Sequence, residues 1–306
     1  MQKTLKSNVT FKGQGLHSGK PVRMTVRPAP VEFGIWFKRT DVADVDPLVP
    51  AHWQSAVHTP LCTRLVNDDA VEVGTVEHIM AALAGCGITN ALIELNGPEV
   101  PILDGSSVMF VRRILATGIA GQDAPLRAIK VEKTVEVRVG DSVARLVPSD
   151  HLEMHFEIDF TDAAIGQQSK SMSLANGAFV HHLCDSRTFC RQSDVESMQE
   201  QGLALGGTME NAIVVDGAEV LSPGGLRHRD EPVRHKMLDA LGDLALAGAP
   251  VMGQYYGYKS GHTLTNKLLQ KLMSDPTNFS IVECDASQAA SLPGAGVSRA
   301  DLAQFI

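Results

Sequence analysis

The sequence predicts an α+β protein built from two domains, and three observations lead to this fold class. The chain has 306 residues, which corresponds to about two domains of ordinary size. Signals for β-hairpins and for helices follow one another in mixed order, which favours α+β layers over a parallel sheet of βαβ units. A faint internal repeat relates the two halves of the chain.

The strand signals are short and end in turns. Residues 135–139 and 142–147 flank Gly140-Asp141, and residues 212–215 and 218–221 flank Asp216-Gly217, so each pair is expected to form a hairpin. Apolar and polar residues alternate strictly over residues 151–160, which indicates a strand with one buried face.

Four segments carry helix signals. Thr75 can cap a helix that Gly85 ends, and Ser106 or Ser107 can cap a second helix that reaches about residue 116. Pro232 suits the first turn of a helix over residues 232–247. Thr265 can cap the last one.

The repeat consists of four identities at a constant separation. Four residue pairs lie 157 positions apart, namely Val76/Val233, His78/His235, Met80/Met237 and Gly85/Gly242. Residues 118–125 are the best candidate for a linker. We therefore expect an N-terminal domain over residues 1–124 and a C-terminal domain over residues 125–306.

Composition excludes several classes of protein. The hydrophobic fraction of 44% and charged fraction of 20% are ordinary for a globular protein. No apolar run approaches the roughly 20 residues of a transmembrane helix, and no signal peptide is recognisable, so we expect a cytoplasmic protein. The net charge of −8 argues against nucleic-acid binding. Five cysteines without a C-x-x-C motif suggest reduced thiols.

The helix over residues 232–247 could hold a metal ion. His235, Asp239 and Asp243 share one helical face at i, i+4 and i+8, and a histidine and an aspartate so spaced can reach one ion. A hydrogen-bonded pair on a helix is the alternative. Glu77 and His78 begin the other helix of the repeat, so His78 could be a third ligand and Glu77 could hold a water. A first-turn glutamate favoured by the helix dipole is the plainer reading.

Two further segments carry reactive side chains. His262 follows Gly261 in a loop before a helix, where it could act as an acid or base, or be an exposed or capping residue. Residues 185–190 form a polar loop without a general motif. From the residues alone, the sequence reaches a two-domain α+β protein that could be a metal hydrolase.

Six further motifs occur in a fixed order. They are Gly13-x-Gly15-Leu16-His17-Ser18-Gly19, Thr75-Val76-Glu77-His78, Glu99-Val100-Pro101-Ile102-Leu103-Asp104-Gly105-Ser106, Ser186-Arg187-Thr188-Phe189, Val233-Arg234-His235-Lys236-Met237-Leu238-Asp239 and Lys259-Ser260-Gly261-His262. Together they resemble one family, the bacterial UDP-3-O-acyl-N-acetylglucosamine deacetylases of lipid A biosynthesis. The resemblance spans essentially the whole chain.

The resemblance implies two similar domains, each with a small insert, and an active site between them. It implies that His78, His235 and Asp239 bind one catalytic Zn²⁺, which leaves a fourth position for water. Glu77 would be the general base and His262 the general acid, Asp243 would orient His262, and Thr188 would donate a hydrogen bond to the oxyanion.

The resemblance also implies where an acylated UDP-sugar binds. Lys236 would meet the UDP phosphates, and Phe160 and Phe189 would line the sugar or nucleotide region. The second insert, near residues 189–214, would form an apolar passage for the acyl chain. Its expected wall residues, which could also be plain core of a βαβ insert, are Val195, Leu203, Ala204, Leu205, Met209 and Val214. Cys190 and Gln192 depart from the family pattern at the passage entrance.

Two rival functions make different predictions. A zinc amidohydrolase for another N-acyl sugar would not need Lys236 for phosphates. A non-catalytic sugar-nucleotide or acyl-chain binding protein with a structural metal would not need Glu77 or His262. We expect the deacetylase, acting as a monomer on a small-molecule substrate, with no nucleic-acid partner.

Overall fold

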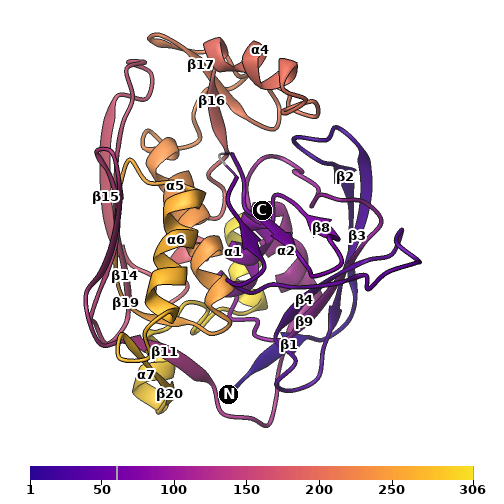
Figure 1. Cartoon of the computed structure of the whole chain (residues 1–306), viewed down its shortest axis with the longest axis vertical. Helices are drawn as coiled ribbons and strands as arrows, with labels where there is room; N and C mark the ends of the chain where they lie inside the picture. Colours follow the sequence, from indigo (N-terminus) through magenta and orange to yellow (C-terminus); the bar gives the residue numbers. More distant parts are fainter. Residues whose placement is uncertain (60, 306) are drawn as a thin grey trace.

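The computed structural model describes residues 1–59 and 61–305. Two sheets flank a central group of helices, with the N-terminal sheet on the right of Figure 1 and the C-terminal sheet on the left. The protein is therefore an α+β fold of two similar halves, as the sequence predicts. None of the helices in the described ranges is long and apolar enough to cross a membrane.

The two halves share one sheet topology. The N-terminal order is β2-β3-β9-β4-β5, and the corresponding C-terminal order is β12-β13-β19-β14-β15. In each set one of the four contacts is parallel, β9 with β4 and β19 with β14, and the other three are antiparallel. The N-terminal strands are β2 (Val9–Gln14), β3 (Pro21–Pro28), β4 (Ile35–Arg39), β5 (Leu48–Pro50) and β9 (Ala91–Leu95).

The C-terminal sheet is larger because two more strands join it. β11 (Arg127–Val131) pairs with β19 and with β20 (Phe279–Glu283). The other strands are β12 (Val135–Val139), β13 (Ser142–Val147), β14 (Leu152–Asp159), β15 (Gln167–Ser173) and β19 (Val251–Tyr258). The predicted hairpin at residues 135–147 is confirmed. So is the alternating strand, because Leu152, Met154, Phe156 and Ile158 are all buried.

Each half carries a small separate sheet. Strands β6 (Ala56–Val57), β7 (Arg64–Val66) and β8 (Glu72–Val73) form the first. The second contains β16 (Phe189–Arg191), β17 (Ile213–Asp216) and β18 (Glu219–Val220), and helix α4 (Gln192–Glu200) connects the parallel strands β16 and β17. This βαβ insert stands at the top of Figure 1.

The central helices are α1 (Glu77–Gly85), α2 (Val108–Thr117), α5 (Glu231–Leu244) and α6 (His262–Met273). Helices α1 and α5 contain the repeat, and they pack together in the core. A Cβ on Gly242 would lie 2.0 Å from the carbonyl oxygen of Glu77, so this position requires glycine. Gly85 is equally constrained, in its case by the ring of Phe179.

The remaining elements are short. Helix α5 continues as the 3-10 helix η1 (Ala245–Ala247), which Gly248 ends with a positive φ of 88°. The others are α3 (Ala178–His182), α7 (Ala286–Ser291) and η2 (Arg299–Phe305), none of which the sequence patterns indicated.

Two predicted helix starts are wrong. Thr75 does not cap α1, because its backbone φ is positive and its hydroxyl donates to buried Glu99. Thr265 lies inside α6, which begins at His262 after Gly261, so His262 is the first helical residue and not a loop residue. The linker candidate at residues 118–125 contains the short strand β10 (Ile119–Gly121), which pairs with β1 (Lys3–Leu5). The division into domains at residues 124 and 125 stays a prediction.

Candidate metal centre and catalytic site

The structure brings His78, His235 and Asp239 together from the two halves of the chain. One ligand atom from each lies within 4.8 Å of the others, and all three residues are buried. Nε2 of His235 and Nε2 of His78 lie 3.3 and 3.6 Å from Oδ1 of Asp239. Within the described residues this is the one such group of three or more metal-ligand side chains.

The donor atoms suit a divalent metal ion. Oδ1 of Asp239 is buried and has no hydrogen-bond partner among the described residues, which is costly unless a cation is bound. Nδ1 of His235 donates to the carbonyl oxygen of Ser186 at 3.0 Å, which leaves Nε2 free to bind a metal. Burial lowers the pKa of His235 to about 4, so its imidazole is neutral, as a ligand must be.

Two potential proton-transfer groups border the donor atoms. Nε2 of His262 lies 3.7 Å from Oε1 of Glu77 and 3.8 Å from Oδ2 of Asp239. Burial raises the pKa of Glu77, although His262 and His78 act against this. Burial lowers the pKa of His262, but the carboxylates of Asp243, Glu77 and Asp239 outweigh it and raise the value to about 9. The site thus places the carboxyl group of Glu77 beside the imidazole of His262.

Thr63 connects these two groups, and sequence reasoning missed it. Its backbone N–H donates to Oε2 of Glu77 at 3.0 Å, and its hydroxyl donates to Oδ1 of Asp243 at 2.5 Å. Asn266 donates to the same hydroxyl at 3.2 Å, so the threonine proton is directed at Asp243. Thr63 stands in no motif, and only its contacts with Asp243 of α5 and Asn266 of α6, which are distant in sequence, place it here.

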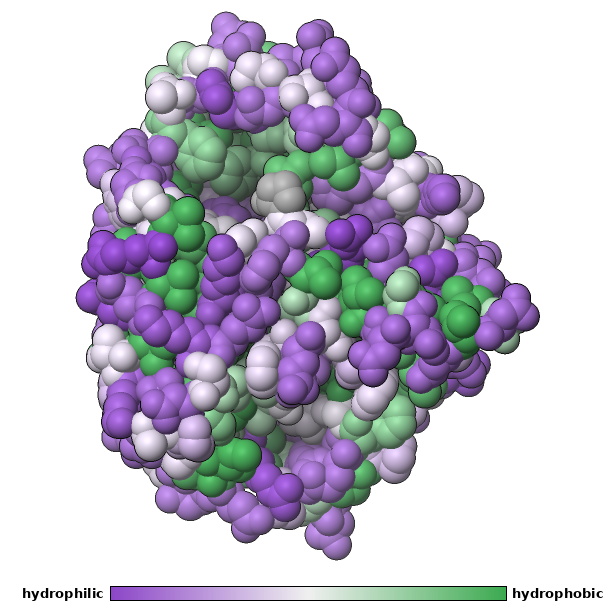
Figure 2. Space-filling model, viewed as in Figure 1, coloured by the Kyte–Doolittle hydropathy of each residue, from purple (hydrophilic) through white to green (hydrophobic). Residues whose placement is uncertain are grey.

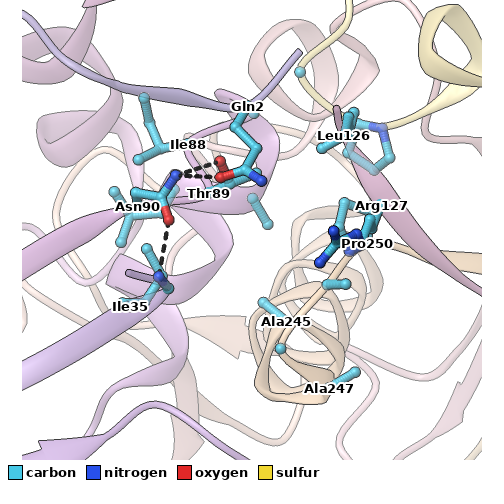
Figure 3. Close-up of a pocket in the computed structure, with 18 of the residues that line it drawn as sticks. Gln2, Ile35, Ile88, Thr89, Asn90, Leu126, Arg127, Ala245, Ala247 and Pro250 are labelled. Carbon is cyan, nitrogen blue, oxygen red and sulfur yellow. Dashed lines mark hydrogen bonds between the residues drawn. The ribbon is translucent and has the colours of Figure 1, made fainter. Parts of the chain in front are cut away.

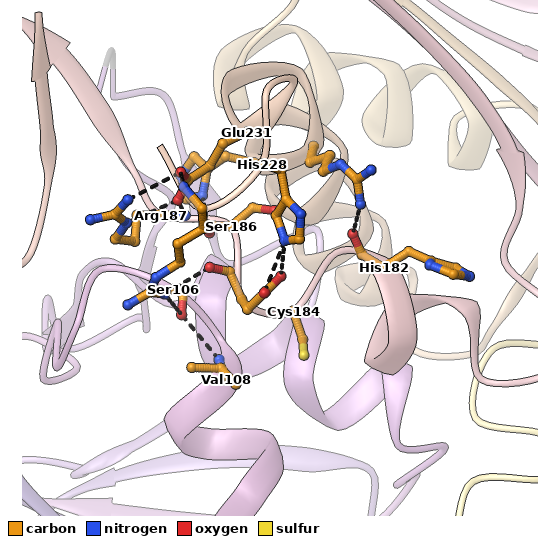
Figure 4. A network of polar contacts seen from close by, with 12 residues as sticks. Ser106, Val108, His182, Cys184, Ser186, Arg187, His228 and Glu231 are labelled. Carbon is orange, nitrogen blue, oxygen red and sulfur yellow. Dashed lines mark hydrogen bonds and ion pairs between the residues drawn. The ribbon is translucent and has the colours of Figure 1, made fainter. Parts of the chain in front are cut away.

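A buried ion pair supports the metal ligands from the insert side (Figure 4). Glu231 is fully buried and accepts hydrogen bonds from the backbone N–H, Nε and Nη2 of Arg187. Arg187 lies next to Ser186, whose carbonyl oxygen fixes the ring of His235. The first turn of α5 therefore holds the 186–188 loop in place.

The other predicted site residues lie at different distances from this centre. The ring of Phe189 is 6.2 Å from that of His235, and Phe160 packs on Phe189 at 5.4 Å. Nζ of Lys236 donates to Oδ2 of Asp239 at 2.9 Å. Thr188 is half-buried, and its backbone pairs with Gly105 and Ile213.

The expected passage residues lie in the βαβ insert. Val214 is buried on β17 and stands opposite Cys190 on β16. The side chains of Val195, Leu203 and Ala204 are half-buried, and Met209 is 43% exposed. Figure 2 shows that the surface below the insert is hollowed and that hydrophobic residues line the hollow.

One residue expected only in a turn also approaches the site. The turn itself is confirmed, because the Gly19 N–H donates to the Gly15 carbonyl oxygen. The side chain of His17 has a buried Nε2 without a partner among residues 1–59 and 61–305. Burial lowers the pKa of His17, Glu99 raises it, and the nearby charge of His262 lowers it further.

Comparison with known proteins gives one consistent result. The LpxC family model, described as UDP-3-O-acyl N-acetylglycosamine deacetylase, matches residues 2–274. A UDP-3-O-acyl-N-acetylglucosamine deacetylase of Stenotrophomonas maltophilia (strain R551-3) is 47% identical over 289 residues, 93% of this chain and 94% of that protein. Proteins of the same name from Myxococcus xanthus (strain DK1622) and Pasteurella multocida (strain Pm70) are 46% and 44% identical, covering 99% and 94% of this chain and 95% of each relative.

Proposed function

The chain belongs to the family of UDP-3-O-acyl-N-acetylglucosamine deacetylases, and from this premise we propose a role for each residue of its site. The chain is an enzyme that removes the N-acetyl group of a UDP-3-O-acyl-N-acetylglucosamine in lipid A biosynthesis. The observation that carries the assignment of residues is the buried cluster of His78, His235 and Asp239, with Glu77 and His262 beside it.

We assign a single Zn²⁺ to the cluster. Two neutral imidazoles and one carboxylate are a common donor set for catalytic zinc and leave one position open. When bound there, zinc supplies Lewis-acid polarisation of the acetamide carbonyl and lowers the pKa of water. The unpartnered Oδ1 of Asp239 supports this assignment.

The proton transfers fall to two neighbouring side chains. Glu77 would accept the proton of the attacking water, because its carboxylate lies next to the donor cluster and is held by Thr63. His262 would protonate the leaving 2-amine, since its pKa of about 9 keeps it charged and its Nδ1 is fixed on Asp243. Thr188 would donate a hydrogen bond to the developing oxyanion.

The substrate would lie across the aromatic side chains and the insert. Phe160 packs on Phe189, and the ring of Phe189 lies beside that of His235. The two phenylalanines therefore suit the sugar or nucleotide part of the substrate. Lys236 would meet the phosphates. The acyl chain would pass along Val195, Leu203, Ala204, Met209 and Val214, where each buried methylene contributes about 0.8 kcal/mol. We further propose that the enzyme is a monomer, which light scattering would test.

Acetate release from UDP-3-O-(3-hydroxyacyl)-N-acetylglucosamine, with and without a chelator, tests the reaction and the metal together. We expect release that the chelator abolishes and that added zinc restores. Glu77→Gln should retain zinc but lose turnover, whereas His78→Ala should lose both. Full activity of metal-free protein would refute the metal assignment, and full activity of Glu77→Gln would refute the base.

A further inference from the structure

A second cavity lies between the two halves, away from the catalytic site. Its volume is about 980 Å³. In Figure 3, Gln2, Ile35 and Asn90 of the N-terminal half face Leu126, Arg127 and Pro250 of the C-terminal half across the open space. None of the metal-ligand or proton-transfer residues lines it.

The cavity and the catalytic site border the same two helices, α1 and α5, but are lined by different residues of them. The N-terminal parts of α1 and α5 carry His78 and His235. Their C-terminal parts carry Leu83 and Leu244, which line the cavity. A ligand bound there could occupy its site at the same time as the substrate.

The size and lining of the cavity are those of a ligand site. Small-molecule pockets typically measure about 300–1,000 Å³, are mostly apolar with a few polar groups, and occur preferentially at domain interfaces. Side chains such as Met80, Leu83, Leu241 and Ile129 supply the apolar wall. A long aliphatic body fits this chemistry better than a sugar or a nucleotide does.

Two cationic side chains, Lys3 and Arg127, line the cavity and favour a ligand with an anionic head group. Nζ of Lys3 donates to the carbonyl oxygen of Gly294 at 3.1 Å and has no carboxylate partner among the described residues. Burial lowers the pKa of Lys3. Arg127 makes long contacts of 3.3 and 3.7 Å to Glu32 and Glu283. Of these two carboxylates only Glu32 lines the cavity. Lys3 and Arg127 therefore carry one more positive charge than this carboxylate balances, and the carboxylate of a ligand would balance it.

We propose that this cavity binds a medium-chain fatty carboxylate, with its aliphatic chain against α1 and α5 and its carboxylate at Lys3 and Arg127. The proposal is independent of the catalytic roles assigned above, because it involves neither the metal ligands nor the acyl passage.

The chain contains its own reporter for this site. It has two tryptophans, Trp36 and Trp53. Trp36 lines the cavity, and Trp53 packs on His52, another lining residue, with ring centroids 5.4 Å apart. Titration of the zinc-loaded protein with decanoate should give a saturable change in tryptophan fluorescence. Affinity should rise about fourfold per methylene, so about 15-fold from octanoate to decanoate.

Variants test the apolar wall of the cavity and its two cationic side chains separately. Ala245→Phe should narrow the cavity and weaken decanoate binding, whereas Ala116→Phe, at an exposed position of α2, should not. The double variant Lys3→Gln/Arg127→Gln should weaken decanoate at least about tenfold and leave 1-decanol unaffected. Arg138→Gln, on an exposed arginine outside the cavity, is the matched control.

Competition distinguishes this cavity from the acyl passage. Decanoate affinity should be the same in the presence of saturating deacetylated product. Displacement by the product, or undiminished binding by Ala245→Phe, would place decanoate in the catalytic cleft and overturn the proposal. The absence of any saturable change would overturn it as well, and acetate release would still report the catalytic site independently.

Discussion

Nδ1 of His262 lies 2.9 Å from Oδ2 of Asp243, and both side chains are buried. Asp243 lies one helical turn beyond Asp239 on α5, but its carboxylate faces the imidazole and not the metal donors. This bond fixes the ring of His262 so that Nε2 points towards Glu77 and Asp239.

Asp243→Asn should therefore impair turnover more than binding. The amide keeps the shape but lacks the charge that holds the imidazolium. We expect kcat to fall about 100-fold, in the range that general acid–base groups contribute, with KM nearly unchanged. Steady-state kinetics and zinc analysis test this. A loss of bound zinc in the variant would instead assign Asp243 to the metal.

Thr63→Val tests the connection between the base and the positioning aspartate. The variant removes the hydroxyl that donates to Asp243 but keeps the backbone N–H that donates to Glu77. We expect about a tenfold lower kcat, because a hydrogen bond to a charged group is lost. Thr63→Ser should retain nearly full activity. Equal kcat values for the two variants would show that the hydroxyl is dispensable.

Glu231→Gln should destabilise the fold and loosen the metal. It leaves the guanidinium of Arg187 buried without its counter-charge, which typically costs about 3–5 kcal/mol of unfolding free energy. Zinc affinity should also fall, since the Ser186 carbonyl oxygen that fixes His235 moves with Arg187. Urea unfolding and zinc titration measure the two effects.

A surface ion pair provides the comparison for Glu231. Arg27 and Glu94 are partly exposed, and Arg27→Gln should cost at most about 1 kcal/mol. The paired change Arg187→Met/Glu231→Leu should recover part of the stability but not the zinc affinity. Recovery of both would mean that packing alone positions the loop.

Gly242→Ala tests the close approach of α1 and α5. Alanine improves helix propensity by about 1 kcal/mol, but its Cβ would collide with the Glu77 carbonyl oxygen. We expect a net loss of about 1–3 kcal/mol in unfolding free energy. Gly121→Ala, where no atom lies within 4 Å of the new Cβ, should change stability little. A stabilised Gly242→Ala would contradict this close approach.

Asp230 should make the free energy of unfolding depend on pH under acidic conditions. Burial raises the pKa of Asp230, but hydrogen bonds from Lys170 and Arg234 outweigh this and lower it to about 2. Because the folded value lies below the unfolded value of 3.8, the carboxylate stabilises the protein above about pH 4. That contribution is lost as the pH falls towards 2.

Asp230→Asn should thus lower the urea midpoint at pH 6, with the difference from the parent shrinking between pH 4 and 2. Asp216→Asn, at an exposed aspartate of β17, is the control and should show no such convergence. A pH-independent difference would mean that Asp230 acts through its helix-capping position and not through its charge.

Local sequence patterns were sufficient to predict several strands and helices. The hairpin at residues 135–147 and the alternating strand at 152–159 follow from turn chemistry and period-two burial, which depend on neighbours in sequence. Helix α5 likewise follows from Pro232 and Gly248. Thr75 and Thr265 misled the prediction because their hydroxyls bond to distant groups, Glu99 and Tyr255, in place of a helix end.

The sequence by itself determined the fold class, the 157-residue repeat and the family, and it supplied the i, i+4 spacing of His235 and Asp239. Only the tertiary structure decided that the donor atoms of His78, His235 and Asp239 meet within 4.8 Å of one another, that Thr63 joins Glu77 to Asp243, and that a separate cavity borders α1 and α5. Spacing along one helix constrains which side chains share a face. Contacts between residues 78 and 235, or 63 and 243, depend on how the two halves of the fold bring segments that are distant in sequence together.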